Sequence, residues 1–233
     1  MSEEQFSLFD SGEIATPATA VDPATIPTNA DVPIPPGTYA DMDAISTVCN
    51  QCHRCGLGET RNHAVISRGN PAAKLMIIGE GPGENEDLTG KPFVGRAGQL
   101  LDRILASVKL TEADVLICNI VKCRPPGNRK PNKSEMAACR PYLMEQIRMV
   151  DPPVILLAGG SAIEGLFEEK GVKITKIRGE WREWEGRQCM PVFHPSYLLR
   201  NPSKEKGSPK WLMWQDIQEV KRKLDEISLE TEF

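Results

Sequence analysis

The sequence predicts a three-layer α/β/α sandwich with a short central parallel sheet. Four short apolar runs are predicted to be strands, and each ends in a segment rich in glycine, proline or polar residues: 74–78, 115–121, 154–158 and 190–193. Apolar residues at helical spacing lie between these runs, an order typical of alternating strands and helices. No internal repeat is present, so we expect one α/β domain over residues 45–230.

Three helices are predicted from apolar residues three or four positions apart. The sets are Leu101, Ile104, Leu105 and Val108, then Leu143, Ile147 and Val150, and last Ile217, Val220, Leu224 and Ile227. For the middle helix, we expect Ser134 to be the N-cap and Pro141 to start a new turn or kink the helix. The charged stretch with Trp181 and Trp184 is expected to form an antiparallel excursion before the fourth strand.

The charge of the chain is unevenly distributed. Residues 1–48 contain eight acidic residues and no Lys or Arg, so the other 185 residues carry a net charge of +4 although the whole chain carries -4. A mildly basic body is compatible with a nucleic-acid partner. Because no apolar run approaches the ~18 residues of a membrane span and no secretory signal opens the chain, we expect a soluble intracellular protein without a membrane partner.

The N-terminal region has two parts. Residues 11–44 are rich in Ala, Pro, Thr and Asp and are predicted to be a disordered acidic linker. Before them, within residues 1–10, Phe6, Leu8 and Phe9 follow Gln5 in a segment with no core of its own. This peptide resembles the one by which bacterial DNA-maintenance enzymes dock on the DNA polymerase sliding clamp. The alternative is an apolar tail with no partner.

Residues 79–93 form a glycine-rich acidic loop between the first strand and the first helix, which is a position typical of ligand sites in α/β sheets. Three glycines in five residues allow the backbone to approach a flat or anionic group closely. The spacing matches neither the phosphate loop of nucleotide-binding proteins nor the dinucleotide-binding motif. The loop therefore predicts a site of another kind.

Seven cysteines in an intracellular chain suggest a metal centre before disulfides. Two separated pairs, Cys52 with Cys55 and Cys123 with Cys139, could hold an iron–sulfur cluster or a structural zinc, and the spacing does not choose between them. Cys49 is an alternative to Cys52, because two residues separate Cys49 from Cys52, just as two residues separate Cys52 from Cys55. The remaining two, Cys118 and Cys189, lie within predicted strands and are interpreted as core residues.

Four motifs, taken with the cysteine pattern, resemble one known family. They are Gly79-Glu80-Gly81-Pro82-Gly83 with Glu86-Asp87, Gly90-x-Pro92-Phe93-Val94-Gly95, Asn119-x-Val121-Lys122-Cys123-Arg124-Pro125-Pro126 and His194-Pro195-Ser196-Tyr197. Over about residues 49–225 the chain is similar to the family 4 uracil-DNA glycosylases, which are iron–sulfur proteins. The resemblance implies a hydrolase of base excision repair that flips uracil out of DNA and cleaves its N-glycosidic bond, leaving an abasic site.

The resemblance also implies a cofactor, an oligomeric state and a cellular location. It implies a [4Fe-4S] cluster held by Cys52, Cys55, Cys123 and Cys139, with Cys49 as a spare and the cluster bracing loops that contact DNA. For such a protein we expect a monomer that acts at the nucleoid in the bacterial cytoplasm.

A uracil pocket is predicted from residues at the ends of the strands. The resemblance implies that Phe93 stacks on the flipped base and that Asn119 reads its edge, the amide carbonyl accepting from N3–H and the amide N–H₂ donating to O4. It places Glu86 against the C5 position, where it would exclude the methyl group of thymine, and the backbone of Gly81 against uracil.

Two residues are predicted to be catalytic. His194 would donate a hydrogen bond to uracil O2, where negative charge develops as the bond breaks, and Glu80 would position the water that attacks the sugar C1′. Ser196, Arg200 and Arg124 are predicted DNA contacts. Further candidate contacts with the phosphate backbone are Lys122 and Arg129.

Three rival functions are considered. A relative that traps uracil-DNA covalently carries a reactive histidine in an inserted basic loop, and residues 129–134 contain no histidine. A relative with broader substrates usually lacks the acidic pair, whereas Glu80 and Glu86 are present here. A non-catalytic DNA-binding iron–sulfur module is disfavoured because every expected pocket residue is retained.

Overall fold

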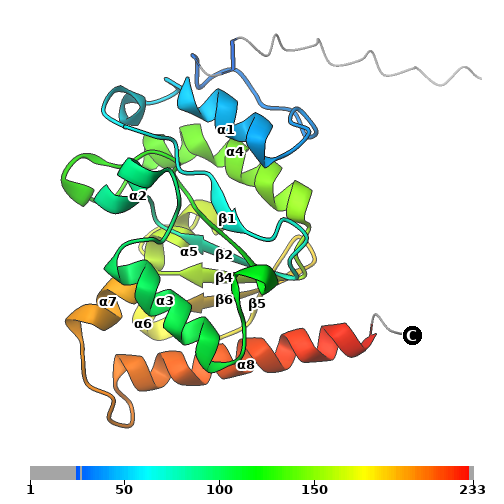
Figure 1. Ribbon diagram of the computed structural model, residues 1–233, viewed down its shortest axis with the longest axis vertical. Coiled ribbons are helices and arrows are strands. Elements are labelled where there is room, and N and C mark those ends of the chain that lie inside the picture. Colours follow the sequence, from blue (N-terminus) through cyan, green and yellow to red (C-terminus); the bar gives the residue numbers. More distant parts are fainter. Residues whose placement is uncertain (1–24, 27, 231–233) are drawn as a thin grey trace, which may run out of the picture.

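The computed structural model describes residues 25–26 and 28–230 of the chain (Figure 1). The predicted clamp-docking peptide, residues 5–9, lies outside the described residues. Among the helices that are described, none has the length and apolarity that a bilayer span requires.

A six-stranded sheet forms the centre of the domain, in the order β1-β3-β2-β4-β6-β5. The strands are β1 (Ser67–Gly69), β2 (Leu75–Gly79), β3 (Val115–Asn119), β4 (Val154–Ala158), β5 (Arg182–Trp184) and β6 (Arg187–Val192). The four inner strands are parallel, as predicted, and β5 pairs antiparallel with β6, as the predicted excursion requires. The antiparallel edge strand β1 was not predicted, because it has three partly buried residues and no apolar run.

Helices cover both faces of this sheet (Figure 1). One face carries α1 (Met42–Asn50), α4 (Lys133–Val150) and α5 (Gly160–Phe167), and the other carries α3 (Arg96–Ser107), α7 (Pro195–Arg200) and α8 (Pro209–Glu230). The shorter segments are α2 (Glu84–Thr89), α6 (Ile174–Ile177) and the 3₁₀ turns Gly56–Glu59, Glu112–Asp114 and Pro126–Asn128. The predicted three-layer sandwich is therefore confirmed.

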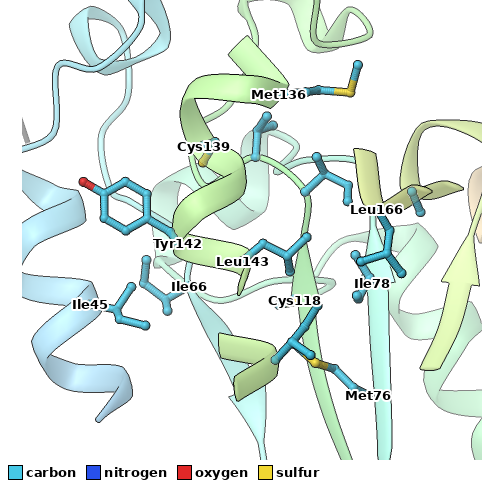
Figure 2. Close-up of a cluster of buried hydrophobic side chains, with 14 of the residues drawn as sticks. Ile45, Ile66, Met76, Ile78, Cys118, Met136, Cys139, Tyr142, Leu143 and Leu166 are labelled. Atoms are coloured by element: carbon cyan, nitrogen blue, oxygen red, sulfur yellow. The ribbon is translucent and has the colours of Figure 1, made fainter. Parts of the chain in front are cut away.

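Each inner strand supplies apolar side chains to both layers, because successive side chains of a strand point to opposite faces. In β2, Met76 and Ile78 pack under α4 and α5, while Leu75 and Ile77 pack under α3 and α8. Figure 2 shows the first of these cores, in which Leu143 of α4 lies over the strands. Burial on both faces explains why the strands are continuous apolar runs.

Helix α4 differs from its prediction at its first residue. Its N-cap is Asn132, not Ser134: the Asn132 side chain accepts a hydrogen bond from the Glu135 N–H at 2.8 Å, while the Ser134 hydroxyl donates to Asn132 Oδ1. Pro141 lies inside the helix, which continues through the predicted apolar residues Leu143 and Ile147 to Val150. Buried side chains on both sides of the proline hold the two halves of α4 in one packed helix.

The segment before α1 packs on the domain. The buried guanidinium of Arg54 donates hydrogen bonds to four backbone oxygens in this segment, those of Ile26, Asn29, Ala30 and Val32. Further along, the buried carboxylate of Glu145 accepts from the N–H groups of Gly37 and Tyr39. The prediction of an unpacked linker up to residue 44 is therefore wrong for the described part of that segment, since two buried charges bind its backbone.

Candidate active site

A pocket of about 380 Å³ lies at the carboxyl ends of the parallel strands, where the loops after β2, β3 and β6 meet. The register of the sheet brings these loops together, because Gly79 at the end of β2 pairs with Asn119 at the end of β3. Eight of the predicted site residues line it: Glu80, Gly81, Glu86, Phe93, Asn119, His194, Ser196 and Arg200. Of the remaining predicted DNA contacts, Arg129 also lines the pocket, whereas Arg124 and Lys122 do not.

Asn119 lies at the base of this pocket and is 1% exposed. Its side-chain oxygen has no hydrogen-bond partner among the described residues, although a buried polar atom normally has one. A Cβ at Gly79 would collide with this oxygen and with the Phe93 ring, so a glycine at this position permits their close approach. The unpartnered amide oxygen is thus an acceptor available for an N–H group of a ligand.

Phe93 forms one wall of the pocket in an unusual backbone conformation. Its φ of 53° lies in the left-handed region, which is a strained conformation for a bulky residue. A Cβ at Gly98 would collide with the Phe93 carbonyl, so α3 holds this backbone closely. The ring centroid lies 5.7 Å from that of His194, which places an aromatic face beside the imidazole.

His194 follows β6 and is the N-cap of the short helix α7. Its Nδ1 accepts a hydrogen bond from the Ser196 N–H at 3.1 Å and lies 2.8 Å from Ser196 Oγ. Because a backbone N–H can only donate, Nδ1 is unprotonated and the proton of the neutral ring is on Nε2. Burial, followed by the nearby Arg200 charge, lowers the pKa of His194 to about 4, so the ring is a neutral donor at physiological pH.

Glu80 has a partner that sequence reasoning missed. Its Oε2 accepts a hydrogen bond of 2.6 Å from the hydroxyl of Ser161, which is buried at the start of α5. The available signal was the position of Ser161, just after β4 at the same edge of the sheet as the other site residues. The hydroxyl holds one carboxylate oxygen of Glu80 at the pocket wall.

The carboxylate of Glu86 also binds the backbone of its own loop. It accepts hydrogen bonds from the N–H groups of Gly83, Val94 and Gly95 at 3.0, 2.9 and 2.8 Å. These bonds join the start of α2 to the start of α3 and keep the Glu86 side chain at the pocket. Glu86 therefore has a structural role beyond the predicted one.

The predicted DNA contacts have different surroundings. Arg200 is exposed at the pocket rim, whereas Arg124 donates to Asn128 Oδ1 at 2.7 Å and Arg129 pairs with Glu135. Lys122 is not a surface cation: it is 1% exposed, and its ammonium donates to the Asn119 carbonyl and to Gln146. The prediction that Lys122 contacts DNA phosphates is wrong, because the first turn after β3 points this side chain inward.

Five cysteines surround a second, smaller cavity between α1, the loop after β3 and α4: Cys49, Cys52, Cys55, Cys123 and Cys139. Hydrogen-bond donors face several of these sulfurs. The Tyr142 hydroxyl lies 3.5 Å from the Cys52 sulfur, and the Lys122 N–H lies 3.3 Å from the Cys139 sulfur. Hydrogen bonds to the sulfurs commonly accompany a thiolate-bound cluster, so this arrangement fits one.

The two remaining cysteines lie outside this cavity. Cys118 and Cys189 are buried in the sheet, as predicted. In the described part of the chain, no group of three His, Cys, Asp or Glu side chains has the arrangement of a single-ion metal site.

Comparison with known proteins agrees with this geometry. Residues 66–218 match the uracil DNA glycosylase superfamily. A type-4 uracil-DNA glycosylase of Thermotoga maritima is 44% identical over 181 residues, which cover 77% of this chain and 93% of that protein. This chain belongs to the type-4 uracil-DNA glycosylase family. Relatives of the same description from Saccharolobus solfataricus (40% identical, 79% of this chain and 87% of that protein) and Sulfurisphaera tokodaii (39%, 71% and 80%) support the assignment of the glycosylase domain.

Proposed function

We propose that this type-4 family member excises uracil from DNA by flipping the nucleotide into the pocket of about 380 Å³ and hydrolysing its N-glycosidic bond. The observation that carries the proposal is the pairing of two groups in one pocket: the unpartnered amide oxygen of Asn119 and the neutral imidazole of His194. One group reads the edge of a base, and the other stabilises charge on it.

Base recognition follows from the residues at the pocket base. Asn119 Oδ1 accepts from uracil N3–H and the amide N–H₂ donates to O4, while cytosine presents the opposite pattern. Phe93 offers its ring face for stacking, and the backbone at Gly81 lies against the base. Glu86 would exclude the C5 methyl of thymine; the support is its place in the pocket lining and the three backbone N–H groups that hold its carboxylate.

The chemical step is a hydrolysis at the sugar C1′. As the glycosidic bond breaks, its electron pair moves onto the uracil ring, and the His194 Nε2–H donates a hydrogen bond to O2, where the negative charge develops. Water adds to C1′, and the proton that it loses neutralises the departing uracil anion. Glu80 positions that water with the carboxylate oxygen that Ser161 does not occupy.

Ser161→Ala is expected to lower kcat roughly tenfold with little change in KM, because a hydrogen bond to a charged group contributes about 1.5–3 kcal/mol. The lost bond affects the orientation of Glu80 and not the contacts with the base. Single-turnover excision and steady-state KM measure the two effects. Ser161→Thr keeps the hydroxyl and is the matched control; equal rates for Ser161→Ala and the unmodified chain would remove Ser161 from the site.

We also propose that the cysteine cavity holds a [4Fe-4S] cluster, bound by Cys52, Cys55, Cys123 and Cys139. The support is the shared cavity and the donors that face its sulfurs, including Arg61 Nη1 at 3.8 Å from the Cys123 sulfur. When bound, the cluster would cross-link three segments and brace the loop after β3, the strand that ends at Asn119.

Cys123→Ser is expected to remove most of the visible iron–sulfur absorbance and to lower the iron content and Tm of the purified protein. The loss of one thiolate leaves the cluster with an incomplete ligand set. Cys49→Ala is the matched control, because Cys49 lines the same cavity outside the proposed ligand set, and it is expected to keep the colour. Full iron content in the Cys123→Ser protein would show that Cys123 is not a ligand of the cluster.

The proposed function is tested with paired oligonucleotides that carry one U or one T. Alkali converts an abasic site into a strand break, so breakage at U alone is the expected result. No breakage would contradict the proposed hydrolysis. A DNA–protein adduct on a denaturing gel would indicate a trapping protein instead.

A clamp partner is a separate proposal. The support is the sequence from Gln5 to Phe9, with three large apolar residues after a glutamine in an otherwise polar region. Deleting residues 5–9 is expected to abolish capture by an immobilised sliding clamp and to leave excision from free oligonucleotides unchanged. Such docking would place the protein at the nucleoid in the bacterial cytoplasm. Undiminished capture would exclude this peptide as the docking element.

A further inference from the structure

A groove of about 430 Å³ lies beside the active-site pocket, between α3, α7 and the start of α8. Aliphatic side chains form its floor, and two tryptophans three positions apart on α8, Trp211 and Trp214, line it. Trp214 is 42% exposed, which is unusual for so large an apolar side chain. Arg103, Lys204 and Lys210 also line the groove, and no acidic residue does.

The cations of this region lack hydrogen-bond and ion-pair partners among the residues that the structure describes. Among the described residues, Arg96, Arg103 and Arg200 make no hydrogen bond or ion pair, whereas the other arginines bind carboxylates, backbone oxygens or an amide. Lys204 and Lys210 form no ion pair with a described residue either. These side chains are therefore available to an anionic ligand.

The pocket and the groove are lined by residues of the same two helices. Helix α3 presents Ala97 to the pocket and Arg103 to the groove, and α7 presents Arg200 to the pocket and Leu198 to the groove. A helix rises 1.5 Å per residue, so Arg103 lies about 9 Å along α3 from Ala97. At about 3.4 Å per nucleotide in one stacked strand, this distance corresponds to two or three nucleotides.

We propose that the groove, named here the Trp214 groove, binds a single-stranded flank of the DNA strand whose uracil lies in the pocket. Bases would stack on Trp214 and Trp211, and Arg103, Lys204 and Lys210 would bind the phosphates. The inference rests on the proposed function for the identity of the pocket ligand. An exposed and a partly exposed aromatic ring, beside cations with no ion pair to a described residue, are the chemistry that sequence-tolerant binding of single strands requires.

The test measures the affinity of the full-length protein for a uracil-free single-stranded oligonucleotide by fluorescence anisotropy at several salt concentrations. Trp214→Ala is expected to raise Kd about fivefold or more, and Trp214→Phe, which keeps an aromatic face, is expected to stay near the unmodified value. Arg103→Ala is expected to reduce the slope of log K against log salt by about 0.7, the value for one phosphate contact on a single strand.

The matched charge control is Lys221→Ala, on the same helix α8 but outside the groove and paired with Asp225. It is expected to leave both Kd and the salt slope unchanged. Unchanged Kd and slope in Trp214→Ala and Arg103→Ala would overturn the proposal. The acidic N-terminal segment, residues 1–24, is the other candidate occupant of the groove. If Trp214→Ala bound a synthetic 1–24 peptide more weakly and kept its DNA affinity, the proposal of a DNA strand in the groove would be overturned in favour of this segment.

The result is separable from the test of uracil excision, because the oligonucleotide contains no uracil. Trp214-dependent binding by a protein that excises nothing would support the groove and contradict the glycosylase. Excision from U-containing strands with no dependence of DNA affinity on Trp214 would contradict the groove alone.

Discussion

Replacing His194 by Ala is expected to lower kcat for uracil excision by about 10²–10³-fold, the range for loss of a donor to a developing oxyanion. The neutral ring presents Nε2–H to the pocket because Nδ1 is occupied by the Ser196 N–H. Single-turnover excision at saturating protein measures the chemical step. His53→Ala is the control, because His53 lies on the surface and pairs with Glu59. A loss smaller than threefold in His194→Ala would exclude His194 as the donor.

The same residue predicts a pH dependence of stability. The pKa of His194 is about 4 in the folded protein, below the usual value of about 6.5 in an unfolded chain. Between these values the unfolded chain binds a proton that the folded protein does not, so the free energy of unfolding falls as pH decreases from 6.5 to 4. The loss is at most about 3 kcal/mol and is complete below pH 4.

Urea unfolding at a series of pH values between 7 and 4 measures this dependence. His194→Asn, which does not titrate, is expected to remove the part of the slope that His194 contributes. An identical slope in the variant would show that the folded protein protonates His194 as readily as the unfolded chain does. Above pH 5 the neutral ring persists, so the excision rate is not expected to fall on account of this group.

Asn119→Asp is expected to lower kcat/KM for uracil by at least about 10²-fold, because a site that reads a base with a buried polar group discriminates strongly when that group changes. A carboxylate cannot donate to uracil O4, and its charge would be buried in a position that is 1% exposed. The altered pattern is expected to admit cytosine weakly, since a carboxylate accepts from its amino group. Competition between U- and C-containing oligonucleotides measures both changes.

Asn128→Asp is the matched control for that substitution. Asn128 lines the same pocket but is exposed and bonded to Arg124, so the same chemical change is expected to alter kcat/KM little. Unchanged kinetics in Asn119→Asp would remove this residue from base recognition. Equal losses of kcat/KM in both variants would show that the added negative charge in the pocket, and not the loss of the Asn119 amide, lowers the activity.

Much of the site could be predicted from its place in the strand pattern. Glu80 and His194 each follow a predicted parallel strand, and Asn119 lies near the end of another. Parallel strands end at the same edge of a sheet, so the convergence of these residues was determined by topology. The role of Ser161 was not, because its hydroxyl meets Glu80 only when β4 pairs with β2. The burial of Lys122 was missed for a similar reason: its partner Gln146 lies on α4.

The sequence by itself determined the alternating architecture of this protein, the cysteine pattern and the residues at the ends of the strands. These features depend on local periodicity and spacing, which a linear chain displays directly. Only the tertiary structure decided the protonated nitrogen of His194, the free oxygen of Asn119 and the packing of residues 28–41 against Arg54 and Glu145. It also placed Trp214 beside Arg103, 111 positions away in the chain. The physical reason is that these properties arise from hydrogen bonds and burial between distant segments, and such contacts exist only once the layers have packed.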